Sequence, residues 1–271
     1  IKGPNTRVIG CEVYMRSFGH GFYVQGNGEN AYFKDCYVEG KMRTTDEMLA
    51  EESGPAARLD YRMVYRNRKG EKKILPDYIK SVAEDGFRTY GVDNLTFINC
   101  TSKNMRGAFE LRSSGHHLKN CTIIGNERGY WIGSNSVVED CEGDAKYGPL
   151  MFIEGNNIDI DVELLANESD RKVHSLGTIH GKNNDIKITP AGDERREKLV
   201  PIKLGFSQPG AGEGMSPYGK RQATNIRLMN ETRMPVELGK RTKNCKVMTR
   251  GEVIRDDGEN NKIKKIGAGS R

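Results

Sequence analysis

The sequence predicts an all-β protein, a parallel β-helix in which short strands wind into one solenoid. Three features indicate this fold: a glycine-led unit that returns along the chain, cysteines at one phase of that unit, and asparagines at its turns. Gly86, Gly107 and Gly129 open successive units, 21 and then 22 residues apart. Such a period is typical of solenoids, in which stacked repeats share a continuous core.

Each unit contains two or three short strands separated by Gly or Asn turns. Residues 21–26 (GFYVQG) match residues 86–91 (GFRTYG), and a second strand that ends in cysteine follows each of them. No unit contains a helix long enough for a parallel crossover, which excludes an alternating β/α fold. The unit returns at 107–121 and 129–141, and weaker copies begin near residues 149, 176, 200, 234 and 252.

The cysteines follow the second strand of their units, most of them directly after Asn or Asp. A disulfide framework would not place its cysteines at one phase of a repeat. We therefore expect a ladder of buried thiols that pack as small apolar side chains, with metal binding or pairing between turns as the alternatives. The residues are Cys11, Cys36, Cys100, Cys121, Cys141 and Cys245.

Asparagines recur at turns just before strands, where the side chain tolerates left-handed backbone dihedrals. Three glycosylation sequons, at Asn94, Asn99 and Asn120, fall within the repeat itself, and we interpret them as structural. The asparagines at the turns are Asn94, Asn135, Asn157, Asn184 and Asn225.

We expect one domain over residues 1–271, interrupted by insertions at 41–85, 190–198 and 205–224. Because residues 1–11 already follow the repeat, we expect earlier N-terminal coils to be missing. The first insertion opens with a capping-box pattern at Thr44 and Glu47 that predicts a short helix through Glu52. It continues as a basic hairpin with its turn at Lys69–Gly70. Long loops of a solenoid are often functional.

Composition limits the classes of partner. The chain has 43 basic and 37 acidic residues, a net charge of +6, which first of all favours solubility. Its apolar runs are far shorter than the roughly 20 residues that a spanning helix needs, so we expect no membrane span. No nucleic-acid motif is recognisable, and none for zinc, nucleotide or flavin.

Side chains alternate along a strand, so the repeat predicts which ones face outward. The inward set is Phe22, Val24, Phe87, Thr89, Phe109, Leu111, Ile132 and Ile153. With coils about 4.8 Å apart, the outward residues form one stripe that mixes guanidinium, phenol, carboxylate and aromatic groups, which is typical of a binding surface. The outward set is Tyr23, Gln25, Arg88, Tyr90, Glu110, Arg112, Trp131, Phe152, Glu154 and His180.

The repeats, the asparagine turns and the cysteine ladder resemble right-handed parallel β-helix proteins of the pectate-lyase-like superfamily, which are polysaccharide lyases and glycoside hydrolases. The likeness extends over nearly the whole chain outside the insertions. It implies an acidic carbohydrate bound along the solenoid, and a secreted or periplasmic location. Because the fold also supports epimerases and adhesins, the resemblance does not specify the reaction.

The leading hypothesis is β-elimination from a polysaccharide that contains uronic acid. Arg88 and Arg112 would neutralise the substrate carboxylate, since arginine binds carboxylates in a bidentate manner. Tyr90 beside an arginine would act as base or acid, and His20 and His180 are further candidates for the base. The basic hairpin, with Arg62 and Arg66, would clamp the polyanion.

Two other classes of function remain open. A glycoside hydrolase would use Glu110 and Glu154, which lie two coils apart in the predicted register, about 9.6 Å, near the spacing of inverting enzymes. Trp131 would then serve as a sugar platform, and residues 19–21 (GHG) resemble a motif of polygalacturonase-type hydrolases, without its accompanying aspartates. The third class is a non-catalytic glycan-binding or structural solenoid.

No cofactor is predicted, and calcium stays open because Asp159 and Asp161 share one strand face. The candidate catalytic residues are Arg88, Tyr90, Arg112, Glu110 and His20. The candidate substrate-binding residues are Tyr23, Trp131, Glu154, His180, Arg62 and Arg66.

Overall fold

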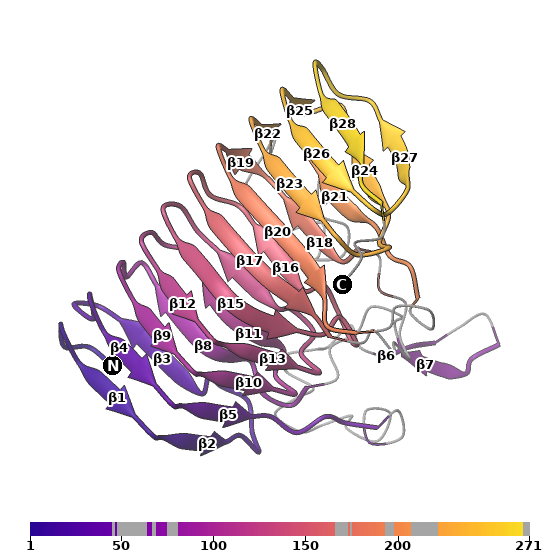
Figure 1. The fold of residues 1–271 in the computed structure, drawn as a ribbon. Coiled ribbons are helices and arrows are strands. Elements are labelled where there is room, and N and C mark those ends of the chain that lie inside the picture. Colours follow the sequence, from indigo (N-terminus) through magenta and orange to yellow (C-terminus); the bar gives the residue numbers. More distant parts are fainter. Residues whose placement is uncertain are drawn as a thin grey trace.

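Short strands stack coil upon coil in one direction along the whole molecule (Figure 1). The computed structural model describes residues 1–44, 47, 64–66, 69–74, 81–165, 173, 175–192, 198–206 and 222–267. The ladders between successive coils are parallel, so the protein is a parallel β-helix, as predicted.

The first sheet, called sheet A here, runs the length of the solenoid. Its main path is β1 (Arg7–Ile9), β4 (Tyr32–Lys34), β9 (Thr96–Ile98), β12 (His117–Lys119), β15 (Val137–Gly143), β17 (Asp159–Leu164), β20 (Asp185–Pro190), β23 (Arg227–Asn230), β26 (Lys246–Thr249) and β28 (Lys262–Lys265). A branch joins this path at β15 and consists of β2 (Glu12–Tyr14), β5 (Tyr37–Glu39), β10 (Thr101–Lys103) and β13 (Thr122–Ile124).

The second sheet, sheet B, contains the strands that begin each unit. Its order is β3 (Phe22–Gln25), β8 (Asp85–Tyr90), β11 (Gly107–Leu111), β14 (Tyr130–Ile132), β16 (Met151–Ile153), β18 (Gly177–Ile179), β21 (Ile202–Leu204), β24 (Val236–Leu238) and β27 (Val253–Asp256). A small third sheet is formed by β19 (Gly181–Lys182), β22 (Ala223–Thr224) and β25 (Thr242–Lys243).

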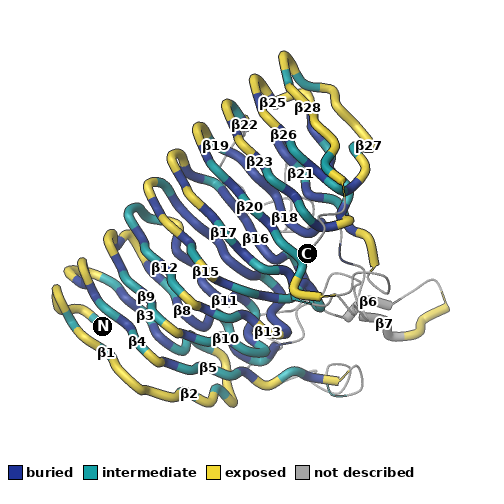
Figure 2. Tube along the Cα trace, in the orientation of Figure 1, coloured by how far each residue is buried: buried dark blue, intermediate teal, exposed yellow. Residues whose placement is uncertain are grey.

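The core lies between the sheets, and Figure 2 shows buried stretches that recur from coil to coil. Phe22, Phe87 and Phe109 stack with ring centroids 5.0 and 4.7 Å apart and nearly parallel planes. Phe33 and Phe97 form a second stack at 4.9 Å. Stacking at the coil spacing gives each ring an apolar contact above and below, which explains why one residue type recurs. The predicted inward set is confirmed, since all eight of its members are buried.

The cysteine ladder is confirmed in five of its six positions. All six thiols are free, and only Cys11 is exposed, because its coil is at the end of the stack. The residue before each cysteine has a left-handed backbone, which glycine, asparagine and aspartate adopt at low cost. This requirement explains the recurring Asn/Asp-Cys pair, and the residues are Gly10, Asp35, Asn99, Asn120, Asp140 and Asn244.

Asparagines also form a hydrogen-bonded ladder at another corner. Asn157 donates to Asn135 over 3.1 Å, and Asn225 donates to Asn183 over 3.1 Å. In the coil that contains Asn183 and Asn184, the turn asparagine predicted from the sequence was wrong by one residue. Asn183, and not Asn184, has the left-handed backbone, with φ at 58°. Asn184 is buried instead, and it donates to two backbone carbonyls because the corner turns inward there.

The first insertion begins and ends at an antiparallel bridge between Met42 and Ser81. Its predicted hairpin is confirmed: β6 (Val64–Arg66) pairs antiparallel with β7 (Lys72–Ile74). Thr44 and Glu47 exchange the two hydrogen bonds of a capping box. The helix predicted beyond them falls on residues 48–52, which lie outside the described residues, as do most of the insertions at 190–198 and 205–224.

A buried histidine in this scaffold makes stability depend on pH. His116 lies between β11 and β12, where Nδ1 accepts from the Leu95 N–H at 3.3 Å and Nε2 lies 3.0 Å from the Ser113 hydroxyl. Burial lowers the pKa of His116 to about 4. Between this value and the ordinary histidine pKa of about 6.5, the unfolded chain binds a proton that the folded protein excludes.

The free energy of unfolding should therefore fall as the pH drops from about 6.5 towards 4, by up to about 3 kcal/mol from this residue. Urea unfolding of the parent and of His116→Gln across that range measures the effect. The parent should lose more stability than the variant, which has no imidazole to protonate. Equal losses in both proteins would show that His116 is not the titrating group.

Candidate functional site

The outward face of sheet B brings the predicted stripe into one register. Tyr23 pairs with Arg88, Arg88 with Glu110, and Glu110 with Trp131. The column continues through Phe152. The outward phase is thus as predicted, but the exposure is not, because Glu110, Trp131 and Phe152 are all buried despite facing away from the core.

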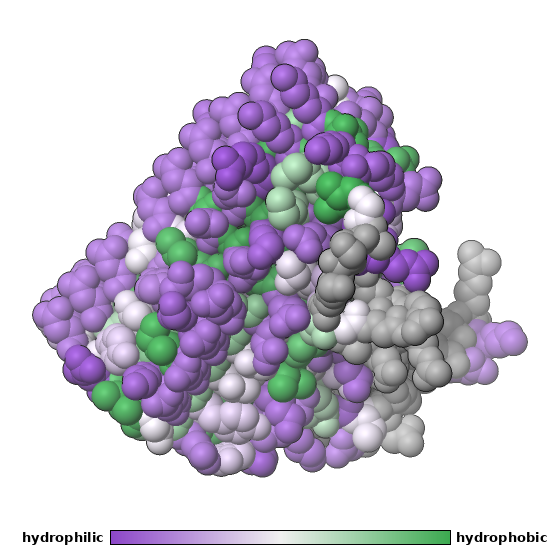
Figure 3. All heavy atoms as spheres, in the orientation of Figure 1, coloured by the Kyte–Doolittle hydropathy of each residue, from purple (hydrophilic) through white to green (hydrophobic). Residues whose placement is uncertain are grey.

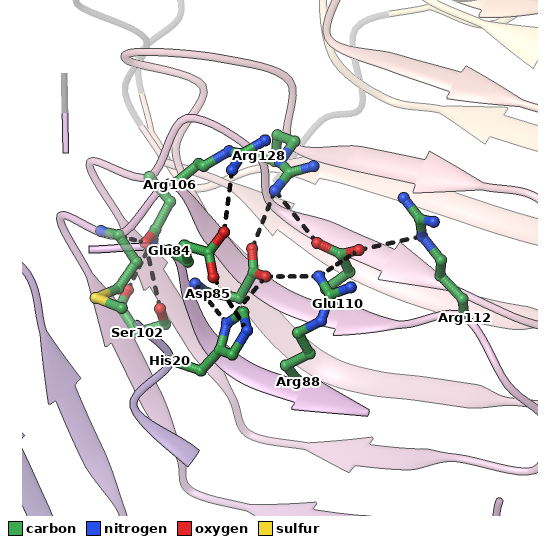
Figure 4. A network of polar contacts seen from close by, with 11 residues as sticks. His20, Glu84, Asp85, Arg88, Ser102, Arg106, Glu110, Arg112 and Arg128 are labelled. Atoms are coloured by element: carbon green, nitrogen blue, oxygen red, sulfur yellow. Dashed lines mark hydrogen bonds and ion pairs between the residues drawn. The ribbon is translucent and has the colours of Figure 1, made fainter. Parts of the chain in front are cut away.

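Glu110 is buried because arginines enclose its carboxylate. Oε1 lies 2.7 Å from Arg88 and 3.2 Å from Arg112, and Oε2 lies 3.2 Å from Arg128. Only 4% of the side chain is exposed. Figure 4 shows the three guanidiniums converging on this carboxylate from three coils.

Asp85 is the second buried carboxylate of the cluster, at the start of β8. Oδ2 accepts from Arg88 at 2.7 Å and Oδ1 accepts from Arg128 at 3.0 Å. Gly107 makes room for it, because a Cβ at that position would lie 2.2 Å from Oδ1. Arg88 and Arg128 therefore bridge Asp85 and Glu110, and these two arginines are committed to holding the cluster together.

His20 lies between two acidic side chains at the edge of the cluster. Its Nε2 is 3.1 Å from Glu84 and its Nδ1 is 3.3 Å from the Asp85 carboxylate. Nδ1 also lies 3.4 Å from the Asp85 backbone nitrogen. A neutral ring can accept from this N–H while donating to Glu84, and a protonated ring can donate to both carboxylates.

The pKa values of the two buried carboxyl groups shift in opposite directions. For Asp85, burial raises the pKa, but the hydrogen bond from His20 and the charges of Arg128 and Arg88 outweigh it and hold the pKa well below its ordinary value. For Glu110, burial and the charge of Asp85 raise the pKa above its ordinary value despite the arginines. Asp85 is therefore the firmly ionised member of the pair.

The charges of the cluster nearly balance. Three carboxylates (Glu84, Asp85, Glu110) oppose four guanidiniums (Arg88, Arg106, Arg112, Arg128), which leaves one positive charge when His20 is neutral. Arg106 binds Glu84 at 3.4 Å on one side of the cluster. Arg112 is on the other side, and with 39% of its side chain exposed it is the most exposed arginine of the four.

Arg112 uses only its Nε within the cluster, on Glu110. Its guanidinium lies 3.7 Å above the Trp131 ring, where the electron-rich face stabilises a cation. Trp131 also packs on Phe152, with centroids 5.2 Å apart. Figure 4 shows the terminal nitrogens of Arg112 directed away from Glu110. They form a charged edge for an anion, whereas Trp131 is covered and cannot act as the open sugar platform that the sequence predicted.

Tyr90 lies at the end of β8 and is 69% exposed. Its hydroxyl makes no hydrogen bond with any residue in the described part of the chain. The paired register of β8 and β11 ends at Arg88 and Glu110, and continued by two residues it would align Tyr90 with Arg112. The 3.2 Å contact between the hydroxyls of Thr89 and Ser113 shows that the two coils are still adjacent there.

Glu154 and His180 follow Arg112 in this second outward column. Glu154 comes directly after the pair Ile153–Ile179, so the register aligns it with His180 and not with Glu110. His180 is 2% exposed, and its Nε2 contacts the Phe206 carbonyl. It is therefore not the accessible base that the sequence suggested, since its coil packs against the residues after β21.

The sequence missed Glu84, Asp85, Arg106 and Arg128, which complete the cluster. A signal was present: His20, Asp85 and Arg128 directly precede a repeat glycine. Asp85 begins β8, and His20 and Arg128 lie two residues before β3 and β14. The ladder also corrects the repeat, because Gly107 pairs with Asp85 rather than with Gly86. The glycine of this coil therefore lies one position early, opposite the carboxylate that it accommodates.

Of the hairpin residues, Arg62 lies outside the described residues, and Arg66 is placed by the backbone of β6. Within the described ranges, no three or more His, Cys, Asp or Glu side chains are arranged to hold a metal ion. Asp161 pairs with Lys187 at 2.9 Å, as expected of an ordinary polar outward face.

A family model described as the right-handed β-helix region matches residues 64–188, a little under half of the chain. The match includes the coils that contain Asp85, Glu110 and Trp131. Together with the parallel ladders it makes the protein a right-handed parallel β-helix. No curated protein matches the chain. In the parts that the structure describes, no helix is long and apolar enough to cross a membrane.

Proposed function

We propose that the protein binds an acidic polysaccharide along the outward face of sheet B and cleaves it by β-elimination. Two observations support this most: Arg112 and Tyr90 are both exposed, and the register of β8 and β11, continued by two residues, aligns them at the rim of a cluster whose other charges largely neutralise one another. A polymer of this kind implies a secreted or periplasmic protein.

In this proposal Arg112 binds the uronate carboxylate through its two terminal nitrogens, in the bidentate geometry that arginine favours. Neutralising the carboxylate makes the hydrogen on the adjacent carbon more acidic. Tyr90, as phenolate, takes that proton. The electrons of the C–H bond form a carbon–carbon double bond, the glycosidic C–O bond breaks, and the leaving oxygen takes up the proton that Tyr90 removed, which restores the phenolate.

Arg88 has a different role from the one expected. Burial lowers the pKa of its guanidinium, but Glu110 and Asp85 outweigh this and raise it. Because two carboxylates already occupy this cation, it acts as a positioning residue for Glu110, which in turn orients Arg112. The hydrolase hypothesis has less support, since Glu110 is enclosed and belongs to a different column from Glu154.

The test is an absorbance assay for unsaturated uronates over a panel of acidic polysaccharides, comparing the parent with Arg112→Ala. Loss of one charge-assisted contact should lower kcat/KM by about 10- to 100-fold. Arg106→Lys, at the other side of the cluster, is the matched control and should retain activity. New reducing ends without unsaturation would indicate a hydrolase. If neither unsaturated uronates nor new reducing ends formed, the protein would bind the polysaccharide without cleaving it.

A further inference from the structure

A column of cations lies on another face of the solenoid, the outward face of sheet A near its last strands. Arg227 pairs with Lys246, and Lys246 with Lys262, in successive coils about 4.8 Å apart. All three are exposed. We call Arg227, Lys246 and Lys262 the basic column.

The sequence repeats the arrangement in each of these coils. An asparagine with a left-handed backbone stands two residues before each cation, at Asn225, Asn244 and Asn260. In the two preceding coils the same position is acidic, Asp159 and Asp185. The charge at this position therefore changes from negative to positive along the solenoid, and the ion pair of Asp185 with Arg227 lies where the sign changes.

Like charges opposite one another in a sheet are unfavourable, and beyond this boundary the described residues provide no carboxylate partner for Lys246 or Lys262. Lysines on an edge strand can serve to prevent edge pairing, which would explain Lys262 on β28. It does not explain Arg227 and Lys246, because β23 and β26 are both paired on two sides.

Two hollows adjoin the basic column and share its three side chains. One, of about 450 Å³, reaches the turn asparagines, and the other, of about 310 Å³, has Met229, Met248 and Ile263 in its lining. Figure 3 shows hydrophobic patches between the hydrophilic side chains of the molecule's surface. Cations, amides and an apolar floor are the groups that suit an anionic sugar chain.

We propose that the basic column binds an anionic polysaccharide chain that runs along the solenoid axis. Its acidic groups contact Arg227, Lys246 and Lys262, its hydroxyls meet the asparagine amides, and its apolar ring faces lie on Met229 and Met248. Nucleic acid fits less well, because no aromatic side chain lines either hollow to stack on bases. The site is separate from the face of sheet B and does not depend on elimination there.

The test measures the affinity of labelled oligogalacturonate by fluorescence anisotropy at low and moderate salt. The parent for this experiment is Tyr90→Phe/Arg112→Ala, so that sheet B neither cleaves nor holds the probe. Adding Lys246→Glu/Lys262→Glu should weaken binding about tenfold and flatten its salt dependence. The matched control Lys2→Glu/Arg16→Glu changes the net charge equally on exposed residues of the N-terminal coils, and it should bind as the parent does.

A heparin-type sulfated oligosaccharide, tested in parallel, distinguishes sulfate from carboxylate as the preferred group. Equal losses in the two charge-reversed proteins, or no loss in either, would overturn the proposal. So would tighter binding of a single-stranded oligonucleotide, or dimerisation through this face in sedimentation. Lys246→Ala/Lys262→Ala removes the two positive charges without reversing them, so its melting temperature should be no lower than that of the parent. Measuring its affinity then repeats the binding test in a variant that is known to be folded.

Discussion

Replacing Tyr90 by phenylalanine should reduce elimination by about 100- to 10,000-fold in kcat, the range for loss of a general acid–base group. The phenol hydroxyl makes no hydrogen bond within the described residues, and the ring is 69% exposed. Removing one exposed oxygen therefore leaves the fold intact. The measurement is the rate of unsaturated uronate formation at saturating substrate, together with the melting temperature.

Tyr23→Phe is the matched control, because Tyr23 is a phenol on the same face, one coil away from Arg88. Its ring packs 5.0 Å from His20 and it lies in a different column from Tyr90. The control should change kcat by less than about tenfold. If Tyr90→Phe kept the full rate while Tyr23→Phe lost it, the proton would be transferred by Tyr23 and not by Tyr90.

Replacing Asp85 by alanine should lower the free energy of unfolding by about 3–5 kcal/mol, the usual cost of removing one partner from a buried ion pair. The side chain is 2% exposed and lies within 3.0 Å of Arg88 and Arg128. Without it, two guanidiniums lose their shared carboxylate, and Glu110 alone remains between them. Urea unfolding near pH 7 measures the loss.

Asp161→Ala is the control, because Asp161 forms an exposed ion pair with Lys187 in which both side chains are more than 40% accessible. Exposed pairs contribute about 0–1 kcal/mol. The pKa of Asp85 is held below its unfolded value, so its contribution is present above about pH 4 and is lost as the pH falls further. Similar small losses in both variants at pH 7 would contradict the view of Asp85 as the centre of the cluster.

The fold could be predicted because each coil repeats the same physical constraints. Left-handed turns select Gly, Asn or Asp before each cysteine, and stacking selects phenylalanine at Phe22, Phe87 and Phe109. Such constraints are local in sequence, and their repetition makes them visible. One exception was Asn184, where two adjacent asparagines left open which of them turns the chain.

The ion cluster could be predicted only in part, because it joins residues from four coils across the first insertion. The alternation of side chains along a strand predicted that Glu110 and Trp131 face outward. It could not predict that Arg88 and Arg112 cover them. Aligning the repeat by its glycines placed Gly107 one position from its true register, which concealed its contact with Asp85. Asp85 and Arg128, which directly precede repeat glycines, were therefore not predicted to meet.

Acidic sugar should bind to the face of sheet B at Arg112 and Tyr90. The most direct test is a crystal structure of Tyr90→Phe soaked with an oligouronate, which this variant should bind without cleaving. We expect a sugar carboxylate on the terminal nitrogens of Arg112, with the adjacent ring C–H directed at the phenyl ring of residue 90. An oligouronate found only on the basic column of sheet A, with Arg112 unoccupied, would contradict it.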